Sequence, residues 1–335
     1  MASSTAPTPE RDAARRQIRL ARATLDRQFA QAVRTLVRDG AARGAECLET
    51  RLSFGLPSLV RSLVGRESPP RLGVVTGFPI PRAGGGVTFE NDGPIGAGHL
   101  AIAAAVLGWP LVFVLDADFA CLAEAIADVA RALGLPFDPL VVTMAGDGAP
   151  ERRRVRAELE AFGLTHLFAI ERPGAARDGF HYSMRAERLD GSFTPSDFLF
   201  RDAPWITAGF ADGGNEIGMG RIGERRIARA ITHGAVIASR TRVDHLTLCG
   251  VSNWGVYGLV AMLALAMPAR RAALLRHFTP ETDRLLFAAL EKAGAVDGVT
   301  RATTASVDGL GLDIHHDKIR ALVRLVAIHA GSRPA

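Results

Sequence analysis

From residue 72 onward, the sequence alternates between short apolar runs of strand length and Ala- and Leu-rich segments of helical character. The runs lie at 72–76, 111–115, 140–143, 166–170, 205–208, 235–239 and 246–249. Continuously apolar strands separated by helices are typical of a parallel sheet covered on both faces. The pattern therefore predicts an α/β fold, a three-layer sandwich around a mostly parallel sheet, over residues 72–330.

The segment before residue 72 has a different character. Residues 1–10 are polar and rich in Pro, Ser and Thr, a composition typical of disorder. Residues 11–38 carry apolar side chains at spacings of three and four, which places them on one face of a helix, and further helical stretches run to about residue 65. We therefore expect an N-terminal helical extension over residues 11–71, packed against the α/β domain or against a neighbouring subunit.

The distribution of charge argues against a nucleic-acid partner. Residues 1–71 hold 13 Arg against seven acidic residues, whereas residues 72–335 are close to neutral. A nucleic-acid binder concentrates basic side chains around its functional site, and here the excess lies outside the motif-rich region. The apolar stretch at 254–267 is too short to span a bilayer and is typical of a buried helix. With no apolar stretch in the first 20 residues, we expect no secretory signal, no membrane contact and a cytoplasmic location.

Lysine is scarce, and the chain has only Lys292 and Lys318. A Walker A loop requires a lysine after its glycine, and pyridoxal phosphate requires a lysine for its Schiff base. Neither lysine lies in a glycine-rich loop, and we interpret both as residues of exposed helices. No GxGxxG pattern follows the first apolar run, so the dinucleotide fingerprint is missing as well. We therefore predict chemistry without a bound nucleotide or pyridoxal phosphate.

The segment 212–220, with the sequence DGGNEIGMG, is a glycine-rich loop that also carries acid and amide side chains. It follows the apolar run 205–208 and precedes a charged helical stretch that begins near Arg221. Glycine permits tight turns and the close approach of a ligand, and functional groups are often carried by loops on a rigid scaffold. The candidates for a small-molecule or metal site here are Asp212, Gly213, Gly214, Asn215 and Glu216.

Other acidic residues also follow predicted strands. Glu90 and Asp92 precede a predicted helix at 94–107, Asp116 ends the second apolar run, and Glu171 follows the fourth. In a parallel sheet, such residues meet beyond the carboxyl ends of the strands. Carboxylates brought together repel one another unless a proton or a cation lies between them, and hard oxygen ligands suit Mg²⁺ or Mn²⁺. The candidate metal ligands are Glu90, Asp92, Asp116, Asp212 and Glu216.

Two of these acids have alternative interpretations. Asp92 is placed to cap the helix that begins at Pro94. Asp116 and Asp118 follow an apolar strand, which resembles the first motif of haloacid-dehalogenase-type phosphatases, although the usual downstream lysine has no counterpart here. A helix cap or a single metal ligand is an equally good interpretation of Asp116.

Arginine and amide side chains supply candidates for substrate binding. Arg172 and Arg177 lie in an irregular stretch after the fourth strand. A guanidinium there suits a substrate carboxylate because its geometry is a planar fork; a solvated charged loop is the alternative interpretation. Asn253 follows the last apolar run, next to Ser252, which is placed to cap the following helix.

In combination, these motifs resemble the D-glutamate cyclase family, specifically its C-terminal, catalytic-type domain. The resemblance rests on TGFP at 76–79, ENDGP at 90–94, ERPG at 171–174, DG at 178–179, the segment 212–220, GVSNWG at 250–255 and VDGL at 307–310, in the family's order. It implies conversion of D-glutamate to 5-oxo-D-proline and water, a carbon–oxygen lyase reaction on a small amino-dicarboxylate. The chain departs from the family pattern at Ala175, His181 and Ser183, where Arg, Tyr and Asn are usual.

Such a cyclisation requires an amine that loses protons, a carboxylate made electrophilic and a leaving oxygen that is protonated. We expect Glu171 to carry protons, with Asp212, Asn215 and Glu216 as further catalytic residues. The residues expected to contact the substrate are Arg172, Arg177, Asn253, Gly213 and Gly214. The acids and the amide expected to converge on one pocket are Glu90, Asp92, Asp116, Glu171, Asp212, Asn215 and Glu216. A metal-dependent phosphohydrolase and a non-catalytic binder of amino-dicarboxylates are the alternatives, and self-association into a homo-oligomer is left open.

Overall fold

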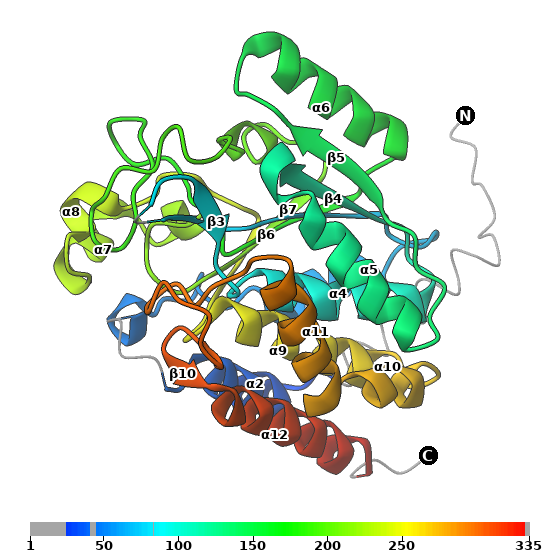
Figure 1. Cartoon of the computed structure of the whole chain (residues 1–335). Coiled ribbons are helices and arrows are strands. Elements are labelled where there is room, and N and C mark those ends of the chain that lie inside the picture. Colours follow the sequence, from blue (N-terminus) through cyan, green and yellow to red (C-terminus); the bar gives the residue numbers. More distant parts are fainter. Residues whose placement is uncertain (1–24, 41–44, 83, 332–335) are drawn as a thin grey trace, which may run out of the picture.

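The computed structural model describes residues 25–40, 45–82 and 84–331, and its centre is one sheet of six parallel strands (Figure 1). The strands are β1 (Leu72–Thr76), β4 (Leu111–Asp116), β5 (Leu140–Met144), β6 (His166–Ile170), β7 (Ile206–Ala211) and β8 (His245–Leu248), in the spatial order β5-β4-β1-β6-β7-β8. The predicted α/β class and parallel sheet are therefore confirmed. The expected disorder of residues 1–10 and the first part of the predicted helix lie outside the described residues.

One predicted strand is wrong. The apolar run 235–239 forms the single helical turn α8 (Gly234–Ile237) instead of a strand. After this turn, the backbone amide of Ser239 donates to Gly214 O and that of Arg240 to Ala175 O, so the segment bonds to loops and not to the sheet. A short apolar run has no periodicity that separates a strand from a buried helical turn, which explains the error.

The sheet has a different cover on each face. One face packs against a thick helical layer, and Phe113, Phe168 and Phe210 point into it. Its helices are α2 (Arg27–Arg38), α3 (Leu56–Val64), α4 (Pro94–Leu107), α5 (Cys121–Ala132), α9 (Ser252–Ala266), α10 (Arg271–His277), α11 (Pro280–Lys292) and α12 (Leu312–Gly331). The alternate strand residues, such as Val112 and Val114, face the second core, as the two-residue period of a strand requires.

The second face is covered by fewer helices and more loops. Its core includes side chains of α6 (Ala149–Phe162), α7 (Glu224–Ala230) and α8, together with the 3₁₀ turns η1 (Ala45–Leu48), η3 (Asp197–Leu199) and η4 (Met219–Arg221). Figure 1 shows α6 on the opposite side of the sheet from α12. Two short hairpins, β2 (Pro79–Pro81) with β3 (Val87–Phe89) and β9 (Ser306–Val307) with β10 (Leu310–Gly311), and the turn η2 (Ala117–Phe119) complete the described elements.

The helices that precede the sheet in sequence belong to the same hydrophobic core as the strands. Phe29, Val33 and Val37 on α2 are fully buried in the thick helical layer. Val33 and Val37 pack so closely on Gly258 of α9 that a β-carbon there would come within 3.1 Å of both. The N-terminal helices therefore cover the α/β domain of their own chain.

Helix α9 is the centre of the helical layer, and every one of its residues is buried. The prediction that this apolar stretch forms a buried helix is therefore confirmed. Among residues 25–40, 45–82 and 84–331, no helix combines the length and the apolar character needed to cross a membrane.

Candidate functional site

The order of the strands defines a crevice at one edge of the sheet. From β1 the chain crosses to β4 and β5 on one side, and it then returns to β6, β7 and β8 on the other side. Ligands of open parallel sheets bind beyond the carboxyl ends of the strands at such a switch point. Glu171 directly follows β6, and Asp212 directly follows β7, so the register of these neighbours places both acids at the switch point.

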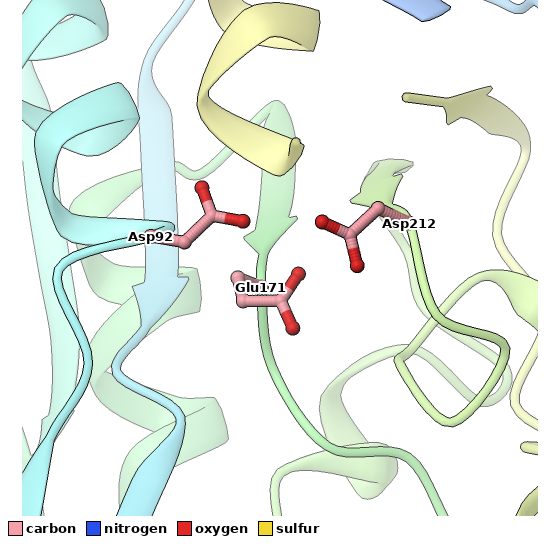
Figure 2. A group of neighbouring side chains, drawn as sticks. All are labelled: Asp92, Glu171 and Asp212. Carbon is pink, nitrogen blue, oxygen red and sulfur yellow. The ribbon is translucent and has the colours of Figure 1, made fainter. Parts of the chain in front are cut away.

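Three carboxylates from separate connections meet there. In Figure 2 the side chains of Asp92, Glu171 and Asp212 point toward a common centre. Each contributes an oxygen that lies within 4.8 Å of the oxygens of the other two, and all three residues are buried. Asp92 comes from the connection between β3 and α4. The sequence prediction that these three acids would converge therefore agrees with the structure.

Burial and mutual repulsion set the protonation of this acidic cluster. Burial, followed by the charges of Asp308 and Asp212, raises the pKa of Asp92 well above its usual range, against the hydrogen bonds that Asp92 accepts from α9. Burial and then the neighbouring carboxylates, Asp212 first, raise the pKa of Glu171 well above its usual range. The cluster therefore favours a bound proton or cation.

Asp92 and Asn253 cap each other's helices. The two oxygens of Asp92 accept hydrogen bonds from the backbone amides of Ser252 and Asn253, at the start of α9, at 2.9 Å each. In return, Asn253 Oδ1 accepts from the amides of Gly93 and Gly96, at the start of α4, at 2.9 and 2.6 Å. Asp92 thus caps a helix distant in sequence, whereas the sequence suggested its own helix, to which Asp92 contributes only through the adjacent Gly93 amide at 2.9 Å. Asn253 is fully buried in this exchange and does not line the cavity described below.

Glu216 organises the glycine-rich loop from inside. Its carboxylate accepts hydrogen bonds from the backbone amides of Asp212, Gly213 and Gly214. Gly214 has a φ of +108°, a conformation that favours glycine. The amides of Gly213 and Gly214, which the sequence suggested for substrate binding, are therefore occupied by Glu216, and Asp212 is held at a fixed position.

A cavity of about 420 Å³ opens beside the acidic cluster. Of the three converging acids, Glu171 lines it, while Asp92 and Asp212 lie behind. Glu90 and Asn215 also line it, as expected. Asn215 Nδ2 donates to Tyr182 O at 2.8 Å, and its buried Oδ1 has no hydrogen-bond partner among the described residues. The volume is in the range of small-molecule sites.

Comparison with known proteins identifies the family of this chain. The sequence pattern of the family described as D-glutamate cyclase-like, C-terminal, matches residues 18–323. The chain belongs to the D-glutamate cyclase-like family. Human mitochondrial D-glutamate cyclase is 33% identical over 182 residues, which is 52% of this chain and 29% of the human protein. The chain thus aligns with less than a third of that relative, and the family match includes the helices that precede the sheet.

Two residues that the sequence placed in the site of this D-glutamate cyclase-like chain lie in a different network. Arg172 is fully buried and binds Asp116 through two hydrogen bonds of 2.6 and 3.1 Å. Arg172 also donates to Gly77 O and Thr194 O, and Asp116 accepts from the Thr194 amide. Neither side chain lines the cavity. The structure therefore does not bring Asp116 into the acidic cluster, because Arg172 neutralises it.

Arg177 also points elsewhere. Its side chain is 75% exposed and pairs with Glu224 at 2.9 Å, and it does not line the cavity beside Glu171. The arginines that do line this cavity are Arg185 and Arg301. The sequence offered no signal for Arg301. Arg185 lay within the irregular stretch already noted, but only the fold shows which of its arginines faces the cavity.

The acidic cluster fits a divalent cation in its chemistry. Asp92, Glu171 and Asp212 offer hard carboxylate oxygens from three connections, and a cation would offset the charge repulsion that raises the pKa values of Asp92 and Glu171. Of the other predicted ligands, Glu216 uses its oxygens on the loop amides, and Asp116 is paired with Arg172.

Proposed function

We propose that this chain is a lyase of the D-glutamate cyclase type, which converts D-glutamate to 5-oxo-D-proline and water. The main support for this proposal is the position of Glu171, which lines the cavity and also belongs to the buried acidic cluster. Membership of the family and the partial identity to human D-glutamate cyclase support the reaction class.

The reaction forms one carbon–nitrogen bond and breaks one carbon–oxygen bond. The amine of the substrate attacks its own γ-carboxylate carbon, and two protons of the ammonium group leave with one carboxylate oxygen as water. Glu171, whose pKa is raised by burial and by neighbouring carboxylates, takes a proton from the ammonium group and returns it to the departing oxygen. The cavity walls hold the substrate folded, so that the amine and the γ-carboxylate touch, and this supplies part of the rate.

Asp92 and Asp212 are the residues that we propose to hold a divalent cation, Mg²⁺ or Mn²⁺, with Glu171 beside them. When bound, such a cation polarises a carboxylate. Hydrogen bonds from the start of α9 hold the carboxylate of Asp92 in place, and the hydrogen bond from its backbone amide to Glu216 holds Asp212. Both side chains are therefore in position before a metal binds.

The test is incubation of the purified chain with D-glutamate, with 5-oxoproline followed by NMR, in metal-free buffer and with added Mg²⁺ or Mn²⁺. We expect lactam from D-glutamate, at a rate that rises with the metal, and little from L-glutamate. Absence of lactam under all these conditions contradicts the proposal. Release of phosphate from phosphoesters would then favour a phosphohydrolase, and saturable binding of D-glutamate without turnover would favour a binding protein.

A further inference from the structure

One wall of the cavity is a small hairpin that spans residues 181–189. The Ser183 amide donates to Glu187 O, and the Leu189 amide donates to His181 O, both at 2.9 Å. His181, at its base, lies between Asp190 and Asp197, with Nδ1 and Nε2 at 3.2 and 2.8 Å from their carboxylates. Side chains between residues 183 and 189 face the cavity.

A second wall, in contact with the hairpin, is the loop at 297–304, and Asp297 holds it in shape. Asp297 is buried, and its carboxylate accepts hydrogen bonds from the amides of Val299 and Thr300 at 2.8 and 2.9 Å. The same carboxylate accepts from Ser306 Oγ and from the Gly309 amide, at 2.6 and 2.7 Å. This loop presents Val299 and Arg301 to the cavity.

Each wall carries one arginine, and the two guanidinium groups have different partners. Arg301 forms an ion pair with Glu187 of the hairpin, so its charge is balanced. Arg185 reaches across to the loop and donates from Nη2 to Val299 O at 2.9 Å. Within the part of the chain that the structure describes, Arg185 has no acidic side chain at ion-pair distance and makes no other side-chain hydrogen bond. One neutral acceptor therefore orients the guanidinium, and its remaining N–H groups and its charge are available at the cavity.

We infer that Arg185 binds the α-carboxylate of the substrate. This inference rests on the proposed function and specifies its substrate class. The residues that line the cavity include Glu171, which belongs to the acidic cluster, and Arg185, which has no acidic side chain at ion-pair distance among the described residues. A planar guanidinium binds a carboxylate through two parallel hydrogen bonds. With the α-carboxylate on Arg185, the amine and the γ-carboxylate are left for Glu171 and its neighbours. The site therefore selects substrates with a free α-carboxylate and discriminates against the α-amide of D-glutamate.

The experiment compares the binding of D-glutamate and of its α-amide by calorimetry, in the wild-type chain and in Arg185→Gln. We expect the substitution to weaken D-glutamate binding by about 10- to 100-fold, the usual effect of losing a hydrogen-bonded charge pair, and to leave the affinity for the α-amide almost unchanged. Arg188→Gln is the matched control, because Arg188 lies on the same hairpin but stacks on Phe180 and pairs with Asp190 instead.

Three results would overturn the inference: Arg185→Gln binds D-glutamate as the wild-type chain does, it loses both ligands equally, or the wild-type chain binds no D-glutamate. The first two results are compatible with lactam formation by the wild-type chain, so the proposed function would survive them. Conversely, Arg185-dependent binding of D-glutamate without lactam formation would support the role of Arg185 and reject the lyase activity.

Discussion

Glu171 combines an unfavourable backbone conformation with an unfavourable charge environment. Its φ of +45° is rare for a residue with a side chain, and its carboxylate is buried beside other acids. Two contacts hold it in place: its amide donates to Phe210 O, and its Oε2 accepts from Ser252 Oγ at 2.7 Å. Residues that persist in such conformations cluster at functional sites, which supports Glu171 as the proton carrier.

Glu171→Gln is expected to lower kcat for lactam formation by about 100-fold or more, because an amide transfers no proton. The amide retains an oxygen acceptor for Ser252 Oγ and removes one acid from the cluster. We therefore expect the free energy of unfolding, measured with urea, to change by less than about 1 kcal/mol or to rise. Asp118→Asn is the control, since Asp118 is exposed on η2. Equal losses of activity in both variants would contradict the assignment of Glu171.

The sequence predicted the acids of the site better than its arginines. Asp92, Glu171 and Asp212 follow from strand ends, because parallel strands deliver their carboxyl ends to one edge. The direction of a side chain that leaves such an end depends on the loop, and therefore Arg172 turned to Asp116 instead of the cavity. Arg185 contacts Val299, and Arg301 contacts Glu187, so both arginines are placed by contacts between segments more than 100 residues apart, which no local pattern encodes.

The elements that carry the site are joined by the exchanged caps of α4 and α9. Without these side chains, α4 and α9 would each begin with unsatisfied backbone amides inside the protein. Asn253, at the start of α9, supplies an acceptor for α4, and Asp92, just before α4, supplies the acceptors for α9. The exchange fixes the position of Asp92 relative to Ser252 and thereby relative to Glu171. Packing, capping and site geometry are therefore coupled at this point.

Asn253→Ala is expected to cost about 2 kcal/mol of unfolding free energy, because the buried Gly96 amide loses its acceptor and the Gly93 amide keeps only Asp92 Oδ1. It should also lower kcat, since α4 and Asp92 shift together. Asp26→Ala removes the cap of α2, far from the site in sequence, and should cost about 1 kcal/mol without a change in kcat. Urea titration and the lactam assay on both variants check this. Unchanged stability in Asn253→Ala would show that the exchanged caps contribute little.

The 181–189 hairpin depends on the charge of His181. Burial opposes that charge, but the hydrogen bonds and the charges of Asp197 and Asp190 outweigh burial and raise the pKa of His181. The folded state therefore holds the proton to higher pH than the unfolded state. The resulting stabilisation is complete below the unfolded value of about 6.5 and is lost as pH rises through the folded value.

We expect this loss to contribute at most about 1.4 kcal/mol per pH unit above pH 6.5. His181→Gln should flatten the pH dependence of unfolding in that window. Urea unfolding of the wild-type chain and of the variant between pH 6 and 9 measures the difference. His233→Gln is the control, because the side chain of His233 makes no ion pair within the described ranges. Parallel pH profiles for the wild-type chain and His181→Gln would contradict this role.

At the scale of the whole molecule, the helices that precede the sheet share one hydrophobic core with it. The sequence indicated a boundary near residue 71, where helical periodicity gives way to strand-length runs. That change is real, but the contact of α2 with α9 joins residues more than 200 positions apart, and sequence periodicity does not report such pairs. Because α9 also carries Ser252 and Asn253, the N-terminal helices support the layer on which the site is built.

Val33→Ala tests whether α2 and the sheet unfold together. Val33 is fully buried on α2 against Gly258 of α9, and removal of its two methyl groups is expected to cost about 2 kcal/mol. If α2 and the sheet form one cooperative unit, urea unfolding followed by far-UV circular dichroism and by tryptophan fluorescence should shift by the same amount and remain coincident. Thr35→Ala, at an exposed position of the same helix, should change stability by less than about 0.5 kcal/mol. A separate early transition in Val33→Ala would show that α2 unfolds independently of the sheet.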